Sequence, residues 1–199
     1  MIILNLTLKG IYGFDDFHIN FSYPKKIVNS IIEHEHLEGR ERFRYKKAVI
    51  LMGANASGKT SLGKALLRIF GFMIDGNAAP LFEMSADEHG YVSIDFVNAD
   101  ARLQRLNIQI DTVRHETDIQ YLTADIDMMD SYEKCVTKLK DRTAEATRTT
   151  AALKKLIGPV HYRFAYPEIE KTLKLTWANK QVLLKTLRVV IGTLDPTLQ

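Results

Sequence analysis

The segment GANASGKT, residues 53–60, constrains the fold of this chain more than any other feature of its sequence. It matches the pattern G-x-x-x-x-G-K-[ST], in which a glycine-rich loop joins a strand to the N-terminus of a helix. The flanks agree with this order: residues 48–52, AVILM, are continuously apolar, and apolar residues recur at helical spacing from about Lys59 to Met73. A continuous apolar run is typical of a strand buried on both faces in the centre of an α/β sheet. We therefore predict a strand, a loop and a helix in succession.

Each position of the motif has a chemical reason. The glycines let the backbone curl so that successive N–H groups face phosphate oxygens, and the helix that follows directs the positive end of its dipole at the same anion. Lys59 would reach the β- and γ-phosphates as the catalytic residue, and the Thr60 hydroxyl would bind Mg²⁺. The sequence thus predicts ATP and Mg²⁺ as cofactors, held by Gly53, Asn55, Ala56, Ser57, Gly58, Lys59, Thr60 and Ser61. The alternative interpretation is a glycine-rich turn with a surface lysine.

Alternating apolar patterns predict strands on both sides of the motif. Residues 4–8 and 17–21 alternate and are joined by a Gly/Asp turn, which indicates an antiparallel pair. Residues 91–96 and 105–110 alternate and indicate a hairpin, to which DIQYLTADI adds a third strand. We expect helices around residues 27–36, from 131 to about 157, and over 183–194.

This order of elements resembles the N-terminal lobe of bacterial ABC-type AAA family ATPases of the SMC and RecF kind. Their loop reads G-x-N-x-S-G-K-[ST], with Asn55 and Ser57 at the matching places here. The opening LTLKGIYGFDDFHINF keeps the strand, turn and aromatic residue of that family, with Tyr12 where the family often has an arginine that touches the nucleotide. The resemblance covers residues 1–125. It implies an α/β P-loop NTPase fold in which residues 1–125 form the ATP-binding lobe with an antiparallel β-subdomain, and residues 126–199 form a helical region.

The resemblance also implies parts of an ATPase site that this sequence does not show. No LSGGQ-like signature is present, and no apolar run ends in the Asp-Glu pair that would hold Mg²⁺ and polarise water. We interpret Asp195, in VVIGTLDPT, as a helix-end residue. Gln104, Gln109 and Gln120 are candidates for the Mg²⁺-sensing glutamine, but the strand patterns favour exposed strand glutamines. We therefore expect the chain to bind ATP, to hydrolyse it poorly alone, and to be an N-terminal portion of a longer ATPase.

The expected function is the ATP-binding portion of an ATPase that couples nucleotide binding and hydrolysis to a DNA- or effector-associated machine. By resemblance, the complete protein would form a homodimer that sandwiches ATP. One alternative is a small P-loop phosphotransferase with RTAEATR as its lid, which the late position of the loop opposes. Another is a non-catalytic module in which bound ATP stabilises docking to a partner.

Composition limits the remaining choices. Cys135 is the only cysteine, which excludes an internal disulfide and favours a reducing compartment, and we expect it to be a core residue. The sequence shows neither a signal peptide nor an apolar run long enough to span a bilayer, so we expect a soluble, cytoplasmic protein. A net charge of +3 does not indicate a nucleic-acid binder, although GRERFRYKK (39–47) alternates basic and aromatic residues that could stack bases. EHEH (33–36) is interpreted as a solvated face rather than a metal site.

Overall fold

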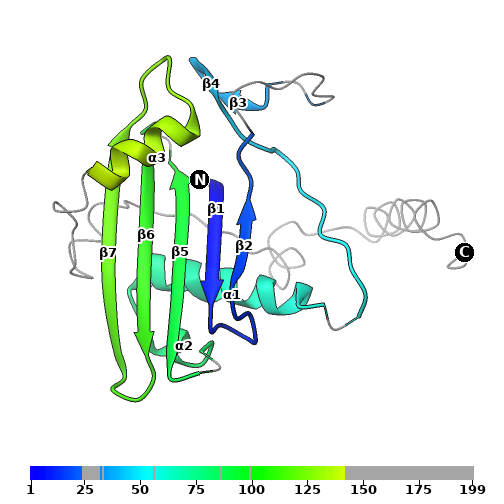
Figure 1. The fold of residues 1–199 in the computed structure, drawn as a ribbon, viewed down its shortest axis with the longest axis vertical. Coiled ribbons are helices and arrows are strands. Elements are labelled where there is room, and N and C mark those ends of the chain that lie inside the picture. Colours follow the sequence, from blue (N-terminus) through cyan, green and yellow to red (C-terminus); the bar gives the residue numbers. More distant parts are fainter. Residues whose placement is uncertain (24–31, 33, 56, 86, 99, 142–199) are drawn as a thin grey trace, which may run out of the picture. The chain divides into compact units, whose positions relative to one another are not determined.

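The computed structural model describes residues 1–23, 32, 34–55, 57–85, 87–98 and 100–141. The chain divides into two compact units, Met1–Val160 and His161–Gln199, and the described residues all belong to the first. Its main feature is a five-stranded sheet with the strand order β2-β1-β5-β6-β7 (Figure 1). The strands are β1 (Ile2–Lys9), β2 (Phe17–Asn20), β5 (His89–Val97), β6 (Arg102–Asp111) and β7 (Glu116–Asp125). Every neighbouring pair is antiparallel.

One face of the sheet is apolar because successive side chains of a strand point to opposite faces. The register pairs Leu6 with Ile94, Ile94 with Leu106, and Leu106 with Tyr121, so these buried side chains share a face. Figure 1 shows the helices α1 (Lys59–Asp75) and α2 (Ala79–Phe82) behind the sheet. The buried side chains of α1 lie on one side of the helix: Leu62, Ala65, Ile69, Phe70, Phe72 and Met73.

The other face of the sheet is covered over only part of its area. The helix α3 (Tyr132–Asp141) and the hairpin of β3 (His36–Leu37) and β4 (Arg40–Arg44) pack there. Their core cluster consists of Leu4, Phe43, Val97, Leu103, Leu122, Ala124, Ile126, Tyr132, Cys135 and Leu139. The part of the chain that we assigned to a helical region therefore contributes to the same core as the sheet.

Most predicted elements are confirmed where the structure describes them. β1 and β2 form the expected antiparallel pair, β5 and β6 form the hairpin, and β7 is the third strand. α1 confirms the helix after the glycine-rich loop. α3 confirms the start of the helix expected from residue 131, but its continuation beyond Asp141 and the helix over 183–194 lie outside the described residues. Most of the helix expected around 27–36 also lies outside them, and its end is wrong, because His36 belongs to β3.

The prediction of a buried central strand at residues 48–52 is wrong for the described chain. The side chains of Val49, Ile50, Leu51 and Met52 are 41%, 80%, 46% and 79% exposed. The preceding segment is paired as far as Lys46, whose N–H donates to the Phe21 carbonyl at 2.7 Å. Beyond Lys46, no strand within the described residues pairs with the run. Apolar composition shows that a segment gains from burial, but burial also requires neighbouring strands.

Candidate nucleotide site

The N-terminus of α1 is not capped by a side-chain hydrogen bond. The helix begins after Gly58, whose φ is +84°, and the Leu62 N–H donates to the Gly58 carbonyl at 2.8 Å. No side chain caps this end, and the first turn contains no acidic residue. The N–H groups of the first turn lack partners within the helix, and the helix dipole places partial positive charge there. This end of α1 is therefore suited to an anion.

Two glycines of the loop lie in close contact with neighbouring side chains. A Cβ atom on Gly53 would lie 2.8 Å from the Ser57 Oγ. A Cβ atom on Gly58 would lie 2.9 Å from two carbons of the Phe14 ring, in a backbone conformation that other residues rarely adopt. The loop is thus curled on itself and in contact with the turn between β1 and β2.

The Lys59 ammonium lies inside the curl of the loop. Its Nζ donates to the carbonyl oxygens of Gly53 and Ala54 at 2.6 and 2.7 Å and to the Ser57 Oγ at 2.9 Å. All three acceptors are neutral, and Lys59 forms no ion pair within the described residues. Its positive charge therefore remains uncompensated beside the helix N-terminus.

The predicted site residues line one pocket of about 650 Å³. They are Asn55, Ser57, Gly58, Lys59, Thr60 and Ser61. Gly53 contributes the carbonyl that binds Lys59, and Ala56 lies outside the described residues. Among the described residues, no carboxylate lines the pocket. The structure thus brings the motif together around a space that carries positive charge only.

The opposite wall of the pocket comes from the turn between β1 and β2, through Tyr12, Gly13 and Phe14. Tyr12 has a φ of +49°, which is uncommon for an aromatic residue, and its N–H donates to the Met84 carbonyl at 2.8 Å. Its hydroxyl oxygen is buried and has no hydrogen-bond partner within the described residues. The sequence indicated Tyr12 only as the residue that stands in place of the family's arginine. It did not identify Phe14 as a residue of the pocket. The available signal was the pattern GIYGF, which places two aromatic side chains on a tight turn.

The pocket has the groups that a magnesium–nucleotide complex needs on its phosphate side. The uncapped N–H groups and Lys59 can donate to phosphate oxygens, and the Thr60 hydroxyl in the first turn can serve as one Mg²⁺ ligand. The missing side chains of Gly53 and Gly58 allow the loop to curl tightly against Ser57 and Phe14. The residues present therefore fit the phosphates of a nucleoside triphosphate.

The candidate glutamines lie in the sheet, and none lines this pocket. Gln104 is 1% exposed and accepts a hydrogen bond from the Tyr121 hydroxyl at 3.0 Å, so the expectation of an exposed side chain is wrong at this position. Gln120 accepts from the Asn107 amide at 2.9 Å, and Gln109 is exposed on the other face of the sheet. These contacts support the interpretation as strand glutamines.

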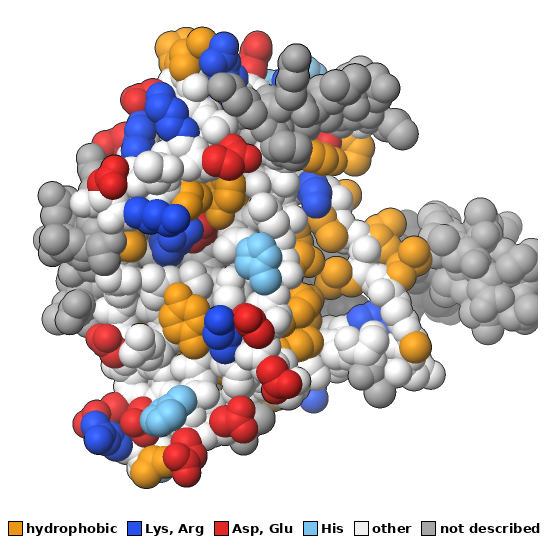
Figure 2. Space-filling model, viewed as in Figure 1, with side chains coloured by type: hydrophobic (Ala, Val, Ile, Leu, Met, Phe, Trp, Pro, Cys, Tyr) orange, Lys and Arg blue, Asp and Glu red, His pale blue; other side chains and the backbone are white. Residues whose placement is uncertain are grey.

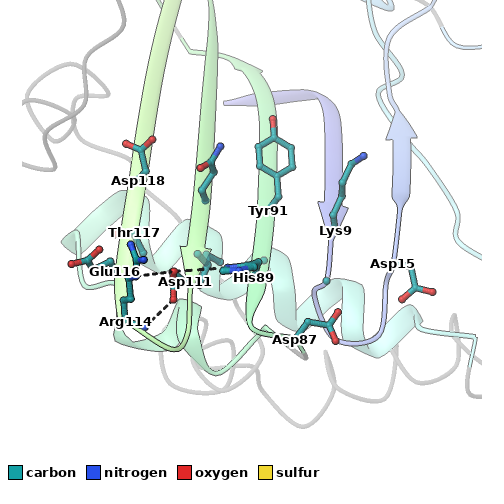
Figure 3. Close-up of a pocket in the computed structure, with 14 residues that line it drawn as sticks. Lys9, Asp15, Asp87, His89, Tyr91, Asp111, Arg114, Glu116, Thr117 and Asp118 are labelled. Atoms are coloured by element: carbon teal, nitrogen blue, oxygen red, sulfur yellow. Dashed lines mark hydrogen bonds and ion pairs between the residues drawn. The ribbon is translucent and has the colours of Figure 1, made fainter.

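A second hollow, of about 900 Å³, lies on the polar face of the sheet (Figure 3). Within it, the carboxylate of Asp111 faces His89 and Arg114, each at 3.9 Å. The Arg114 backbone N–H donates to this carboxylate, and that bond is the main cause that lowers the pKa of Asp111. Figure 2 shows charged side chains of both signs spread over this face. Although this hollow is the larger, it lacks the converging N–H groups of the loop pocket.

The other candidates from the sequence have structural roles within the described residues. Phe43, in the middle of GRERFRYKK, is 1% exposed in the core and cannot stack a base. Cys135 is fully buried, which confirms it as a core residue. No group of three or more potential metal ligands occurs in the described part of the chain. The interpretation of EHEH as a solvated face is wrong at Glu35, which is 4% exposed and accepts a hydrogen bond from the Lys47 N–H at 3.1 Å. His36 lies in β3. Among the described helices, none has both the length and the apolar character to cross a bilayer.

No protein-family model matches this chain, and no curated protein is similar to it.

Proposed function

We propose that this chain is the ATP-binding portion of an ABC-type AAA family ATPase with a P-loop NTPase fold. The observation that carries the proposal is the uncapped N-terminus of α1 beside the Lys59 ammonium, which has no carboxylate partner within the described residues. Converging N–H groups, a helix dipole and a cation together favour a polyphosphate. The aromatic turn opposite the loop leaves room for the nucleoside part of the ligand.

Binding requires Lys59 to exchange its acceptors. Its Nζ now bonds to two loop carbonyls and to Ser57, and phosphate oxygens would replace them as charge-assisted acceptors. Thr60 would supply a hydroxyl to Mg²⁺, which neutralises phosphate charge when bound. Asn55, Ser57 and Ser61 offer further polar contacts at the same pocket.

We further propose that the chain alone turns ATP over slowly. Hydrolysis needs a group that positions the attacking water, and such a group is usually a carboxylate or an amide. No carboxylate lines the pocket in the described part of the chain, and the nearest amide is that of Asn55. In the complete assembly, a cytoplasmic homodimer would sandwich ATP and act on DNA or an effector protein.

The proposal is tested by titrating the chain with a fluorescent ATP analogue in the presence of Mg²⁺. We expect Lys59→Ala to weaken binding by at least tenfold, because it removes a charge-assisted contact of about 1.5–3 kcal/mol. Lys64→Ala is the matched control, since Lys64 is an exposed lysine of the same helix that does not line the pocket. Equal affinities for the two variants would refute the assignment of the loop. Turnover at ordinary enzyme rates by the purified chain would refute slow hydrolysis.

The absence of a carboxylate among the described pocket residues also favours a second candidate, a non-catalytic module in which ATP controls partner docking. An experiment on the purified complete assembly distinguishes these two candidate functions. Phosphate release from ATP by that assembly supports the ATPase. Nucleotide-dependent association without phosphate release supports the module. A small-molecule phosphotransferase would instead yield a phosphorylated acceptor in a screen with labelled ATP.

A further inference from the structure

One edge of the five-stranded sheet ends in a long strand that has a neighbour on one side only. β7 contains ten residues and pairs with β6 over its whole length, without a bulge. Figure 1 shows it at the outer edge of the sheet, and no described strand pairs with its outer side. The opposite edge strand, β2, has only four residues. Lysine, proline or a bulge usually protects such an edge, yet β7, ETDIQYLTAD, contains neither lysine nor proline.

The hydrogen-bond pattern of the sheet shows which residues of β7 face outward. In an antiparallel sheet, successive residues direct their backbone groups alternately to the two neighbouring strands. The Thr112 N–H donates to the Glu88 carbonyl at 3.0 Å, so the even-numbered residues of β6 bond to β5 and the odd-numbered ones bond to β7. The register of β6 with β7 pairs odd numbers with even numbers. The odd-numbered residues of β7 therefore face away from the sheet: Thr117, Ile119, Tyr121, Thr123 and Asp125.

Most of these outward backbone groups have no partner among the described residues. Outside the sheet, no backbone hydrogen bond in the described chain involves residues 117–123. The Asp125 carbonyl, by contrast, accepts from the Lys138 Nζ at 3.1 Å. The unpaired part of the edge therefore extends from residue 117 to residue 123. Unpaired N–H and C=O groups on an edge strand are a template for another strand.

The sequence of this segment fits a second copy of itself. Antiparallel pairs that exchange hydrogen bonds across the edge join outward-facing residues, so both members have odd numbers. A register centred on Gln120 pairs Thr117 with Thr123 of the second copy, and Ile119 with Tyr121 of the second copy. Pairs of threonines and pairs of an aromatic with a β-branched residue are favourable across strands. The two strands would form about eight backbone hydrogen bonds.

Neighbouring registers fit less well. A register centred on Tyr121 pairs Thr117 with Asp125, whose carbonyl is occupied by Lys138. A register centred on Ile119 leaves the outward groups of Thr123 without a strand residue opposite, because β7 begins at residue 116. The register centred on residue 120 uses the unpaired segment and nothing else.

The charges at the two ends of β7 are compatible with this register. Figure 3 shows Glu116 and Asp118 on β7, where both are exposed and neither forms an ion pair within the described residues. The other end of β7 lies beside the last turn of α3, which contains Lys138 and Lys140. Antiparallel pairing about a twofold axis brings the acidic end of each copy beside this turn of the other. The register also places Glu116 opposite Ala124, so the acidic residues do not face one another.

We propose that two copies of this chain associate through β7, so that their two five-stranded sheets form one continuous sheet. The contact is the same on both copies and closes on itself, as twofold contacts do. It goes beyond the proposed function, because no residue of β7 lines the loop pocket and the pairing needs no nucleotide.

The experiment is disulfide cross-linking of the full 199-residue chain. In the proposed register, residue 120 lies opposite residue 120 of the second copy in a pair without hydrogen bonds, where Cα atoms are about 4.5 Å apart. A disulfide can bridge this distance. We therefore expect Gln120→Cys to form a covalent dimer under mild oxidation with copper phenanthroline, seen on a non-reducing gel. The wild type should stay uncoupled, because its Cys135 is buried.

Two cysteine variants are the controls. Asp118→Cys lies on the same strand, but residue 118 of the second copy would be displaced by four residues, about 13 Å along the strand. Gln109→Cys is exposed on the same face of the sheet, on β6 rather than at the edge. Neither should cross-link as Gln120→Cys does. Similar yields from the three variants, or a higher yield at residue 118 than at residue 120, would overturn the proposal.

Sedimentation equilibrium gives an independent readout without any cysteine substitution. Thr117→Pro removes an outward N–H that has no bond to β6, so it should raise the dimer Kd about tenfold without lowering the urea midpoint. Glu116→Lys should raise the Kd by a similar factor, because each change acts twice in a twofold dimer. Glu41→Lys, the same change at an exposed residue of β4, is its control. A wild type that is monomeric at every concentration, or equal Kd values for the two lysine variants, would refute the contact.

A final variant separates this contact from a nucleotide sandwich. Lys59→Ala without nucleotide should dimerise as the wild type does, because Lys59 lies in the loop pocket and not on β7. If dimerisation requires both Mg-ATP and Lys59, the association belongs to the nucleotide site, and the pairing through β7 is wrong.

Discussion

At Gly58, both the backbone conformation and the packing favour glycine over any residue with a side chain. Its φ of +84° lies in the left-handed region, and a side chain there would collide with the Phe14 ring. Ser57 beside it contributes its hydroxyl to Lys59. The start of α1 and the position of the lysine thus depend on this residue.

We predict that Gly58→Ala destabilises the chain by about 1–2 kcal/mol, the usual cost of left-handed backbone for a residue with a Cβ, and also weakens nucleotide binding. Gly63→Ala is the control, because its Cβ would meet no atom within 4 Å in a helix interior. It should stabilise the chain by roughly 0.5–1 kcal/mol. Urea unfolding measures both variants. Similar stabilities of the two would contradict the packing argument.

We predict that substitution of Tyr12 has different effects on the stability of the free protein and on nucleotide binding. Its hydroxyl is buried without a partner in the described residues, so Tyr12→Phe should leave the stability of the free chain unchanged or slightly higher. If the hydroxyl donates to the nucleoside part of the ligand, the same variant weakens ATP binding by about 5–10-fold, as for a bond of about 1 kcal/mol. Inorganic triphosphate should bind both proteins equally. Lower stability of the free Phe variant would show that the hydroxyl serves the fold.

At the scale of elements, α3 is fixed to the sheet through a buried ion pair. Arg105 donates two hydrogen bonds, of 2.6 and 2.7 Å, to the fully buried carboxylate of Asp95. The Tyr132 hydroxyl of α3 donates to the same carboxylate at 2.6 Å. Burial and the nearby Asp95 raise the pKa of Tyr132, which keeps this hydroxyl a donor. The group therefore links β5, β6 and α3.

Tyr132→Phe removes a hydrogen bond to a buried charge, so we predict a loss of about 1.5–3 kcal/mol in unfolding free energy. Tyr121→Phe is the matched comparison, since its buried hydroxyl donates to the neutral Gln104 amide oxygen at 3.0 Å. That loss should be about 0.5–1.5 kcal/mol. Chemical denaturation of both variants measures the two losses in unfolding free energy. A larger loss at Tyr121 would contradict the ranking.

Asp130, just before α3, gives the same region a pH dependence. Burial would raise the pKa of its carboxyl, but hydrogen bonds from Lys134, Lys138 and the Asp127 N–H outweigh burial and lower the pKa well below its usual range. A lowered folded-state pKa stabilises above the unfolded value of about 3.9, and this stabilisation is lost as pH falls below it.

Asp130→Asn should therefore cost about 1.5–3 kcal/mol at pH 7, the range for lost bonds to a charged group. The difference from the wild type should shrink as the pH falls below about 4. Asp125→Asn is the control, because Asp125 is 64% exposed and pairs with Arg102 at the surface. Its effect should stay below about 1 kcal/mol. A pH-independent gap for Asp130→Asn would refute the linkage.

At the scale of the whole molecule, Cys135 reports on opening of the first unit. Its thiol is fully buried, and burial, followed by the nearby Asp130, raises the pKa of the thiol to about 12. Since the thiolate is the reactive form, a disulfide reagent at pH 8 should modify it only through unfolding. Labelling should be fast in urea and slow in buffer. Mg-ATP at saturating concentration should slow it further, because a ligand that binds the folded state lowers the unfolded population. Fast labelling in buffer would contradict the buried position.

Because the pKa of Cys135 is raised in the folded state, this thiol stabilises the fold at low pH and loses that effect as the pH rises. The neutral thiol is favoured in the folded state, so its contribution is present below the unfolded pKa of about 8.5. It is lost as the pH rises toward the folded value of about 12.

Local patterns were enough to predict the strands and the helix that carry the site. Alternation in residues 4–8, 91–96 and 105–110 indicated β1, β5 and β6, because period two places side chains on opposite faces. The motif at residues 53–60 indicated the loop and the start of α1, because glycine and lysine at fixed spacing leave few other conformations for an anion-binding turn.

Other features depended on residues distant in sequence, and only the tertiary structure revealed them. Phe14 contacts Gly58, and the Tyr12 N–H reaches Met84, through packing that no local pattern encodes. Phe43 alternates with basic residues as a stacking aromatic would, yet it is buried because β4 folds onto α3 and the sheet. Residues 48–52 also show that a local pattern does not determine burial. Their composition specifies a need for burial, whereas their exposure is decided by which strands are present to pair with them.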